Sequence, residues 1–294
     1  LSAIGNLVCL KADDGQKVWS VDIMQAFAGR HIMWGLSESL LVFDDMVICV
    51  PGGEKVSMVA LDRKTGEVLW ECEGAGDRPG YASPILVDYK GLRQIVTVMS
   101  ASVVGVRAAD GKLLWQYPHK VYADENITMP LFHEGFLIVS GCVKKGTTSL
   151  QLNVADDTCT VSKRWHNPQL DNKQGGLVLL DGRIYGYAES LNRSTPWMCI
   201  DFASGKNISR SAPVLSSYKY RNGCLTYADG MFYLYSDNGH MVLAKATDKG
   251  FAVTGRLALQ NRGKRPTWAH PVVHGGRLYI RYGDRLGAYD VRGK

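Results

Sequence analysis

The stretch Val59–Trp70, which reads VALDRKTGEVLW, decides the fold because it recurs along the chain. The same twelve-residue pattern returns without a gap at Val8–Trp19 and at Val104–Trp115. A fourth copy, Met198–Ser209, has Ser in place of Trp, and a weaker copy ends at Trp165. The tryptophans at 19, 70, 115 and 165 are spaced by 51, 45 and 50 residues. This is the repeat length of a four-stranded propeller blade.

Each copy describes two strands joined by a tight turn. The side chain of Asp62 can bond to the turn backbone, and Gly66 can take a positive φ. Two more alternating apolar runs, such as 83–87 and 93–98, complete four strands per repeat. One repeat cannot bury its apolar face alone, so successive repeats must stack. The sequence therefore predicts an all-β propeller of four-stranded antiparallel blades. The large indoles that would dock between neighbouring blades are Trp19, Trp70, Trp115 and Trp165.

About seven blades are represented in one predicted domain, 1–294. Complete blades are expected at 35–73, 81–117, 126–167, 174–212 and 222–259. Residues 1–23 hold only the last two strands of a blade, and 268–294 hold three strands of another. The chain begins with Leu1 and shows no signal peptide, so we expect N-terminal strands to be missing from an eight-bladed ring. A ring closed on the strands present is the alternative.

Composition excludes several other classes of protein. Hydrophobic residues make up 46% and charged residues 21% of the 294 residues, as expected for a folded soluble protein. No apolar run approaches the roughly 20 residues of a transmembrane helix. The net charge of +6 is spread along the chain, which does not indicate nucleic-acid binding. The seven cysteines are widely spaced without a CxxC motif, so we expect free, buried thiols. We also expect the protein to be a monomer.

The pattern at Ala60–Trp70, with its echoes, resembles the tryptophan-docking motif of the pyrroloquinoline-quinone-like (PQQ-like) β-propeller repeat family. That family includes quinoprotein alcohol dehydrogenases and the propeller lipoprotein of the outer-membrane barrel-assembly machinery. Gly80–Pro84, Gly175–Leu179 and Arg265–Val273 look like a bacterial branch of the family. The resemblance implies a periplasmic or otherwise exported protein. It says little about activity, because docking residues hold blades together and contact no substrate.

The quinoprotein dehydrogenases resemble one another in an adjacent Cys–Cys pair over the quinone, a Glu/Asn/Asp set around calcium, and a base Asp. No two cysteines are adjacent here. Asp124, Glu125 and Asn126 could hold Ca²⁺, but such a run equally forms a solvated turn. We therefore expect no catalytic residue, no metal site and no cofactor. PQQ with Ca²⁺ belongs only to the alternative hypothesis, a dehydrogenase that oxidises an alcohol or a sugar.

Propeller geometry places candidate binding residues on the loops that lead into the innermost strands, where they would line one mouth of the central channel. The candidates are Trp34, Arg78, Tyr81, Asn126, Lys173, Gln174, Arg221, Asn222, Arg265, Trp268 and His270. Aromatic, amide and cationic groups around one concave mouth suit a small anionic or carbohydrate ligand. A polar rim without a specific ligand is the alternative. The sequence thus predicts a non-enzymatic ligand-binding or protein-interaction scaffold.

Overall fold

The computed structural model describes residues 1–189, 197–212, 222–259 and 268–292. These residues form seven antiparallel sheets and one α-helix, the four-residue α1 (Ile23–Ala26). They fold as two compact units. Unit 1 comprises Leu1–Val139 and Ser149–Arg164, and unit 2 comprises Ser140–Thr148 and Trp165–Lys294. The all-β architecture of propeller blades is confirmed, whereas the single domain and the eight-bladed ring stay predictions.

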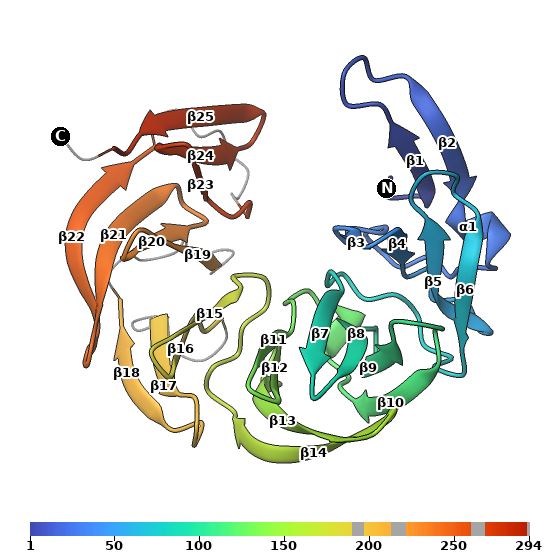
Figure 1. Ribbon diagram of the computed structural model, residues 1–294. Helices are drawn as coiled ribbons and strands as arrows, with labels where there is room; N and C mark the ends of the chain where they lie inside the picture. The colour runs from blue at the N-terminus through green and yellow to red at the C-terminus, as the bar shows by residue number, and fades with distance from the viewer. Residues whose placement is uncertain (190–196, 213–221, 260–267, 293–294) are drawn as a thin grey trace. The chain divides into compact units, whose positions relative to one another are not determined.

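The sheets of unit 1 follow one another in chain order (Figure 1). The first pairs β1 (Asn6–Leu10) with β2 (Lys17–Asp22). The second contains β3 (Leu41–Phe43), β4 (Met46–Cys49), β5 (Val56–Asp62) and β6 (Val68–Glu73). The third contains β7 (Ile85–Tyr89), β8 (Leu92–Val98), β9 (Ser102–Arg107) and β10 (Leu113–Pro118). A 3-10 turn at Tyr122–Asp124 precedes the next sheet.

The fourth sheet contains β11 (Leu131–His133), β12 (Phe136–Gly141), β13 (Gly146–Ala155) and β14 (Thr158–Asn167), and the border between the units falls within its strands. Unit 2 continues with β15 (Leu177–Leu180), β16 (Arg183–Tyr187), β17 (Trp197–Asp201) and β18 (Asn207–Ser211). The next sheet contains β19 (Gly223–Ala228), β20 (Met231–Ser236), β21 (His240–Thr247) and β22 (Gly250–Ala258). The last contains β23 (Val272–His274), β24 (Arg277–Tyr282) and β25 (Arg285–Asp290). Each sheet lies within its predicted blade, except that β10 ends at Pro118, one residue beyond the predicted limit.

The apolar cores lie between successive sheets. In unit 1, Ile48 and Met58 of the second sheet form one buried cluster with Ile95 and Val104 of the third. In unit 2, the rings of Tyr185 and Phe232, from neighbouring sheets, have centroids 4.7 Å apart. This arrangement follows from the repeat, because a single blade has an apolar face that only the next blade can cover.

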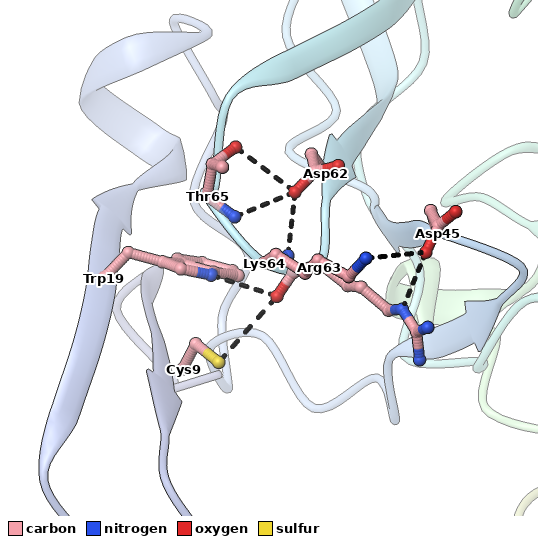
Figure 2. Close-up of polar contacts among 7 residues, drawn as sticks. All are labelled: Cys9, Trp19, Asp45, Asp62, Arg63, Lys64 and Thr65. Atoms are coloured by element: carbon pink, nitrogen blue, oxygen red, sulfur yellow. Dashed lines mark hydrogen bonds and ion pairs between the residues drawn. The ribbon is translucent and has the colours of Figure 1, made fainter.

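Three of the four predicted tryptophans donate an indole hydrogen bond to the following sheet. The indole N–H of Trp70 donates to the carbonyl of Ala108 at 3.1 Å. Trp19 donates to the Arg63 carbonyl at 3.1 Å, and Trp165 donates to the Phe202 carbonyl at 3.0 Å. Figure 2 shows the contact between Trp19 and Arg63. Each hydrogen bond ties the last strand of one sheet to the outer hairpin of the next, that is, the hairpin of its third and fourth strands.

The turn that presents the acceptor carbonyl is built by Asp62 (Figure 2). Its carboxylate accepts the backbone N–H groups of Lys64 and Thr65, both at 2.8 Å, and the Thr65 hydroxyl at 3.2 Å. These hydrogen bonds hold the pKa of Asp62 below its ordinary value, and the bond from the Thr65 backbone N–H contributes most. Gly66 closes the turn with a φ of +77°, a conformation that favours glycine. The turn signal read from the sequence is therefore confirmed at atomic level.

Trp115 docks differently from the other three. It packs in a core cluster with Leu150 of β13, so it does lie between neighbouring sheets. Its indole N–H, however, donates to the side chain of Gln94 in its own sheet at 2.8 Å. The following hairpin, β13–β14, turns over only two residues and lacks the Asp-x-x-Thr-Gly turn that supplies the acceptor elsewhere. Gly105, paired opposite Trp115, leaves room for the ring on its own sheet.

The cysteines behave as small hydrophobic residues. All seven are free, and only Cys9 is partly exposed. Burial raises the pKa of the Cys72 and Cys224 thiols to about 12, so both are protonated at neutral pH. Within the described ranges, no helix has the length and apolar character needed to cross a bilayer.

Candidate functional site

The loops that lead into the first strand of each sheet, here called the inner-strand loops, are fixed by backbone hydrogen bonds. Ser100, in the turn after β8, donates its N–H to the carbonyl of Arg78 at 3.0 Å. In unit 2, Asp237 makes the equivalent bond to Asn222 at 3.0 Å. At Arg78 and at Asn222 the chain is thereby held against the turn between the second and third strands of its own sheet. The backbone that carries the side chains of Arg78 and Asn222 is therefore fixed in position.

In unit 1, three inner-strand loops are connected through predicted site residues. The hydroxyl of Tyr81 accepts the backbone N–H of Trp34 at 3.3 Å. The backbone N–H of Tyr81 donates to the carbonyl of Asn126 at 2.7 Å. The indole N–H of Trp34 reaches Glu125 Oε1 at 3.4 Å, and Arg78 forms an ion pair with Asp124. The structure therefore brings together Trp34, Arg78, Tyr81 and Asn126.

Asn126 holds this part of the fold together. Its side chain is buried, and its amide nitrogen donates to the carbonyls of Met99 at 2.8 Å, Ser100 at 3.2 Å and His119 at 2.9 Å. A buried amide that joins three backbone segments fixes the loop conformation. The side chain faces the protein interior, so Asn126 positions its neighbours and is not itself exposed to a ligand.

Large apolar side chains on the same loops point to solvent. Met33 is 76% exposed, Trp34 is 68% exposed and Tyr122 is 70% exposed. These three residues are called the aromatic surface below. Trp34 and the turn that carries Tyr122 are joined by the hydrogen bond between Trp34 and Glu125. Met33 and Tyr122 were not among the residues predicted from the sequence, although both lie on loops that lead into the first strands of sheets.

In unit 2, the structure brings together four further predicted residues. The ring Nε2–H of His270 donates a hydrogen bond to the carbonyl oxygen of Gln174 at 2.8 Å. Gln174, Asn222 and Trp268 line a common recess that is too narrow for a water molecule. Trp268 is 49% exposed at its rim. As built, this recess has no room for a small ligand.

The remaining predicted residues have separate outcomes. Lys173 is half-buried next to Gln174 and does not line the recess. Arg221 and Arg265 lie outside the described residues. The residues of unit 1 and those of unit 2 form two sets, and their convergence on one channel mouth stays a prediction.

The described residues do not fit a quinone–calcium site. The seven cysteines are all free and none neighbours another in sequence, so no Cys–Cys pair is present. Among the residues placed by the structure, no three His, Cys, Asp or Glu side chains gather closely enough to share a metal ion. The run Asp124–Asn126 is committed to other contacts, because Asp124 pairs with Arg78 and Asn126 is buried.

Comparison with known proteins places this geometry in context. The family described as outer membrane protein assembly factor BamB matches residues 1–211. The crystal structure of BamB from Moraxella catarrhalis is similar over 97% of this chain and 76% of that chain, with 14% identity and a TM-score of 0.64.

Two solved dehydrogenases have the same fold at similarly low identity. The dihydro-heme d1 dehydrogenase NirN matches with 11% identity and a TM-score of 0.63, over 98% of this chain and 59% of that chain. The quinohemoprotein alcohol dehydrogenase from Comamonas testosteroni matches with 12% identity and a TM-score of 0.55, over 84% of this chain and 51% of that chain. The chain thus spans little more than half the length of these two enzymes. No curated protein matches it in sequence.

Proposed function

The chain belongs to the family of outer membrane protein assembly factor BamB, and we propose that it is a non-enzymatic scaffold that binds a protein partner through the aromatic surface. The family description points to assembly of outer membrane proteins, so the proposed partner is a component of the barrel-assembly machinery. This role places the protein in the periplasm. The proposal concerns the loops of unit 1, which lie within the matched residues.

The exposure of Trp34 is the observation that carries the proposal. A large indole that is 68% exposed, with Met33 and Tyr122 exposed nearby, forgoes the stabilisation that burial would give. Tryptophan, tyrosine and methionine are enriched where proteins contact each other, and a few such residues supply most of the binding free energy. The hydrogen bonds of Trp34 to Tyr81 and Glu125 hold the backbone and the ring in place before a partner arrives. Preorganisation of this kind lowers the entropic cost of association.

The polar contacts around the aromatic surface support a rigid docking platform. Arg78 and Asp124 satisfy each other as a half-exposed ion pair, and Asn126 anchors the adjacent backbone from within. An ion pair at the rim of an interface contributes little to affinity but restricts which partners fit. The narrow recess of unit 2 does not provide a comparable site for a small anion or sugar. A protein partner is therefore favoured over a small ligand.

Alanine variants of the aromatic surface test the proposal. Trp34→Ala and Tyr122→Ala should each weaken binding to the purified barrel-assembly machinery by about 30-fold, the effect of removing an interface residue worth about 2 kcal/mol. The melting temperature should change little, because both side chains are mainly exposed. Binding is measured by surface plasmon resonance with the machinery immobilised in detergent.

Leu69→Ala is the matched control. Leu69 is also a large apolar residue of unit 1 and is 49% exposed, but it lies on the fourth strand of its sheet. Its truncation should leave the affinity unchanged. Equal affinities for the wild type, Trp34→Ala and Tyr122→Ala would contradict the proposed role of the aromatic surface.

A further inference from the structure

A β-bulge in the outer hairpin marks the position of the docking tryptophan. In β5–β6, Ala60 pairs with Trp70 and the register shifts immediately after Ala60. In β21–β22, Leu243 pairs with Gly255 and the register shifts immediately after Leu243. Gly255 therefore occupies the position that Trp70 has in its own sheet. The sequence does not reveal this, because the turn of β21–β22 lacks the repeated motif.

The backbone carbonyl that accepts the indole N–H of a docked tryptophan also has an equivalent next to Gly255, in the last sheet. The Ala108 carbonyl, which accepts the indole N–H of Trp70, belongs to a residue whose own N–H donates to Arg93 at 3.0 Å. Val291 makes the corresponding backbone bond to Gly276 at 3.0 Å, directly after β25. The Val291 carbonyl thus stands where docked tryptophans find their hydrogen-bond acceptor.

A cavity of about 350 Å³ occupies the place of the absent ring. It is lined on one side by Leu243, Gly255 and Leu257 and on the other by Leu278, Tyr289 and Val291. A Cβ added to Gly255 would meet only the Leu243 side chain, at 3.6 Å. This volume is at the lower end of the range of small-molecule sites, and its walls are mainly apolar with a few polar groups.

Absence of the tryptophan does not open a cavity everywhere. In β17–β18, Ser209 takes the same position before the bulge. There the next sheet packs directly against Ser209. The Ser209 hydroxyl oxygen lies 2.3 Å from the position that a Cβ on Gly250 would take. The slot beside Gly255 is open, although Leu243, which pairs with Gly255, is larger than Ala60, which pairs with Trp70.

We propose that this slot binds a small planar aromatic molecule that carries a ring N–H, of the indole class. The ring would lie between Leu243 and Leu278, and its N–H would donate to the Val291 carbonyl. Three tryptophans of this chain show that the blade geometry accepts such a ring with a hydrogen bond of 3.0 to 3.1 Å. The inference is independent of the aromatic surface, which lies in unit 1.

Calorimetry with the full chain tests the proposal, with indole and 1-methylindole as probes. Indole should bind with a dissociation constant of about 0.1–1 mM, in keeping with its few atoms. 1-Methylindole, which cannot donate the ring hydrogen bond, should bind roughly fivefold more weakly. Amide resonances of Leu243, Gly255 and Val291 should shift on titration with indole.

Filling the slot supplies the second arm. Gly255 does not have a positive φ, so its backbone accepts a side chain, and Gly255→Trp should abolish indole binding and raise the melting temperature. Lys249→Trp adds the same residue at the exposed tip of the hairpin and should leave indole binding unchanged. Failure of the wild type to bind indole at several millimolar would overturn the proposal, as would equal binding of both probes or resonance shifts elsewhere. The wild-type titration decides the matter even where Gly255→Trp fails to fold.

Discussion

Gly111 shows how closely a docked indole approaches the following sheet. A Cβ on Gly111 would lie 2.5 Å from the ring of Trp70, well inside van der Waals contact. The same relation joins Trp19 to Gly66 and Trp165 to Gly205. The glycine of the repeated motif therefore has two roles, because it also supplies the positive φ of the turn.

These two roles can be separated by comparing Gly111 with Gly91. Both have a φ of +77°, but a Cβ on Gly91 meets nothing within 4 Å. Gly91→Ala should cost only the backbone strain, about 1 kcal/mol. Gly111→Ala should cost about 1–3 kcal/mol more, because the indole must move. Urea unfolding of both variants measures the difference, and equal losses of stability would show that the indole does not rest on Gly111.

At the residue scale, the sequence predicts which tryptophans dock but not how each one does. Trp19, Trp70 and Trp165 each donate to a backbone carbonyl on the next sheet. Trp115 does not, because the following hairpin lacks the turn that presents the carbonyl. Such an outcome depends on a neighbour about 40 residues away along the chain, which a local motif does not describe.

Glu38 brings a pH-sensitive group into the loop before β3. Its carboxylate accepts the backbone N–H of Val50 at 3.0 Å, which joins the loop to the residue after β4. Burial raises the pKa of Glu38 from 4.5 to about 7, and the hydrogen bond from Val50 offsets part of this rise. The folded protein therefore binds the proton of Glu38 more tightly than the unfolded chain does.

This pKa predicts a loss of stability as the pH rises. Between pH 4.5 and about 7 the unfolded chain loses the Glu38 proton before the folded protein does, so the free energy of unfolding falls across this window and levels off above it. Glu38→Gln keeps an acceptor for Val50 and removes the titration, so this variant should be more stable than the wild type above pH 7. The control variant Glu54→Gln, at an exposed position, should have the same stability as the wild type above pH 7. Thermal unfolding from pH 4.5 to 8 measures this, and parallel curves for the wild type and Glu38→Gln would contradict it.

At the scale of elements, the strands are predictable and the loops are less so. Alternating apolar residues and glycine turns fix hairpins locally, so the predicted blades match the sheets to within one residue beyond their limits. The inner-strand loops depend on contacts between repeats, such as the bond from Tyr81 to Asn126. The sequence thus placed Trp34 and Tyr81 on neighbouring loops, but it could not show that Tyr122 is exposed and Asn126 buried.

At the scale of the whole molecule, the chain shares its fold with two dehydrogenases of low sequence identity, and we predict that it does not bind a quinone. Titration with PQQ and Ca²⁺ should therefore show no saturable binding at micromolar concentration, because the chain has no adjacent cysteines to cover the quinone. No alcohol-dependent dye reduction should follow. The measurement is fluorescence and dye reduction on the purified full chain, and dye reduction that rises with added PQQ would establish the dehydrogenase alternative.

The protein has two compact units, and the aromatic surface lies on unit 1. The place where a partner binds can therefore be tested directly. Photo-crosslinking in intact cells answers it, with benzoylphenylalanine placed in turn at Trp34, Tyr122 and the control Leu69. The account predicts one adduct of the same mass from Trp34 and Tyr122, identified by mass spectrometry as a component of the barrel-assembly machinery, and none from Leu69. Absence of that adduct at Trp34 and Tyr122, or equal yield at Leu69, would contradict the central claim that the inner-strand loops of unit 1 bind the partner.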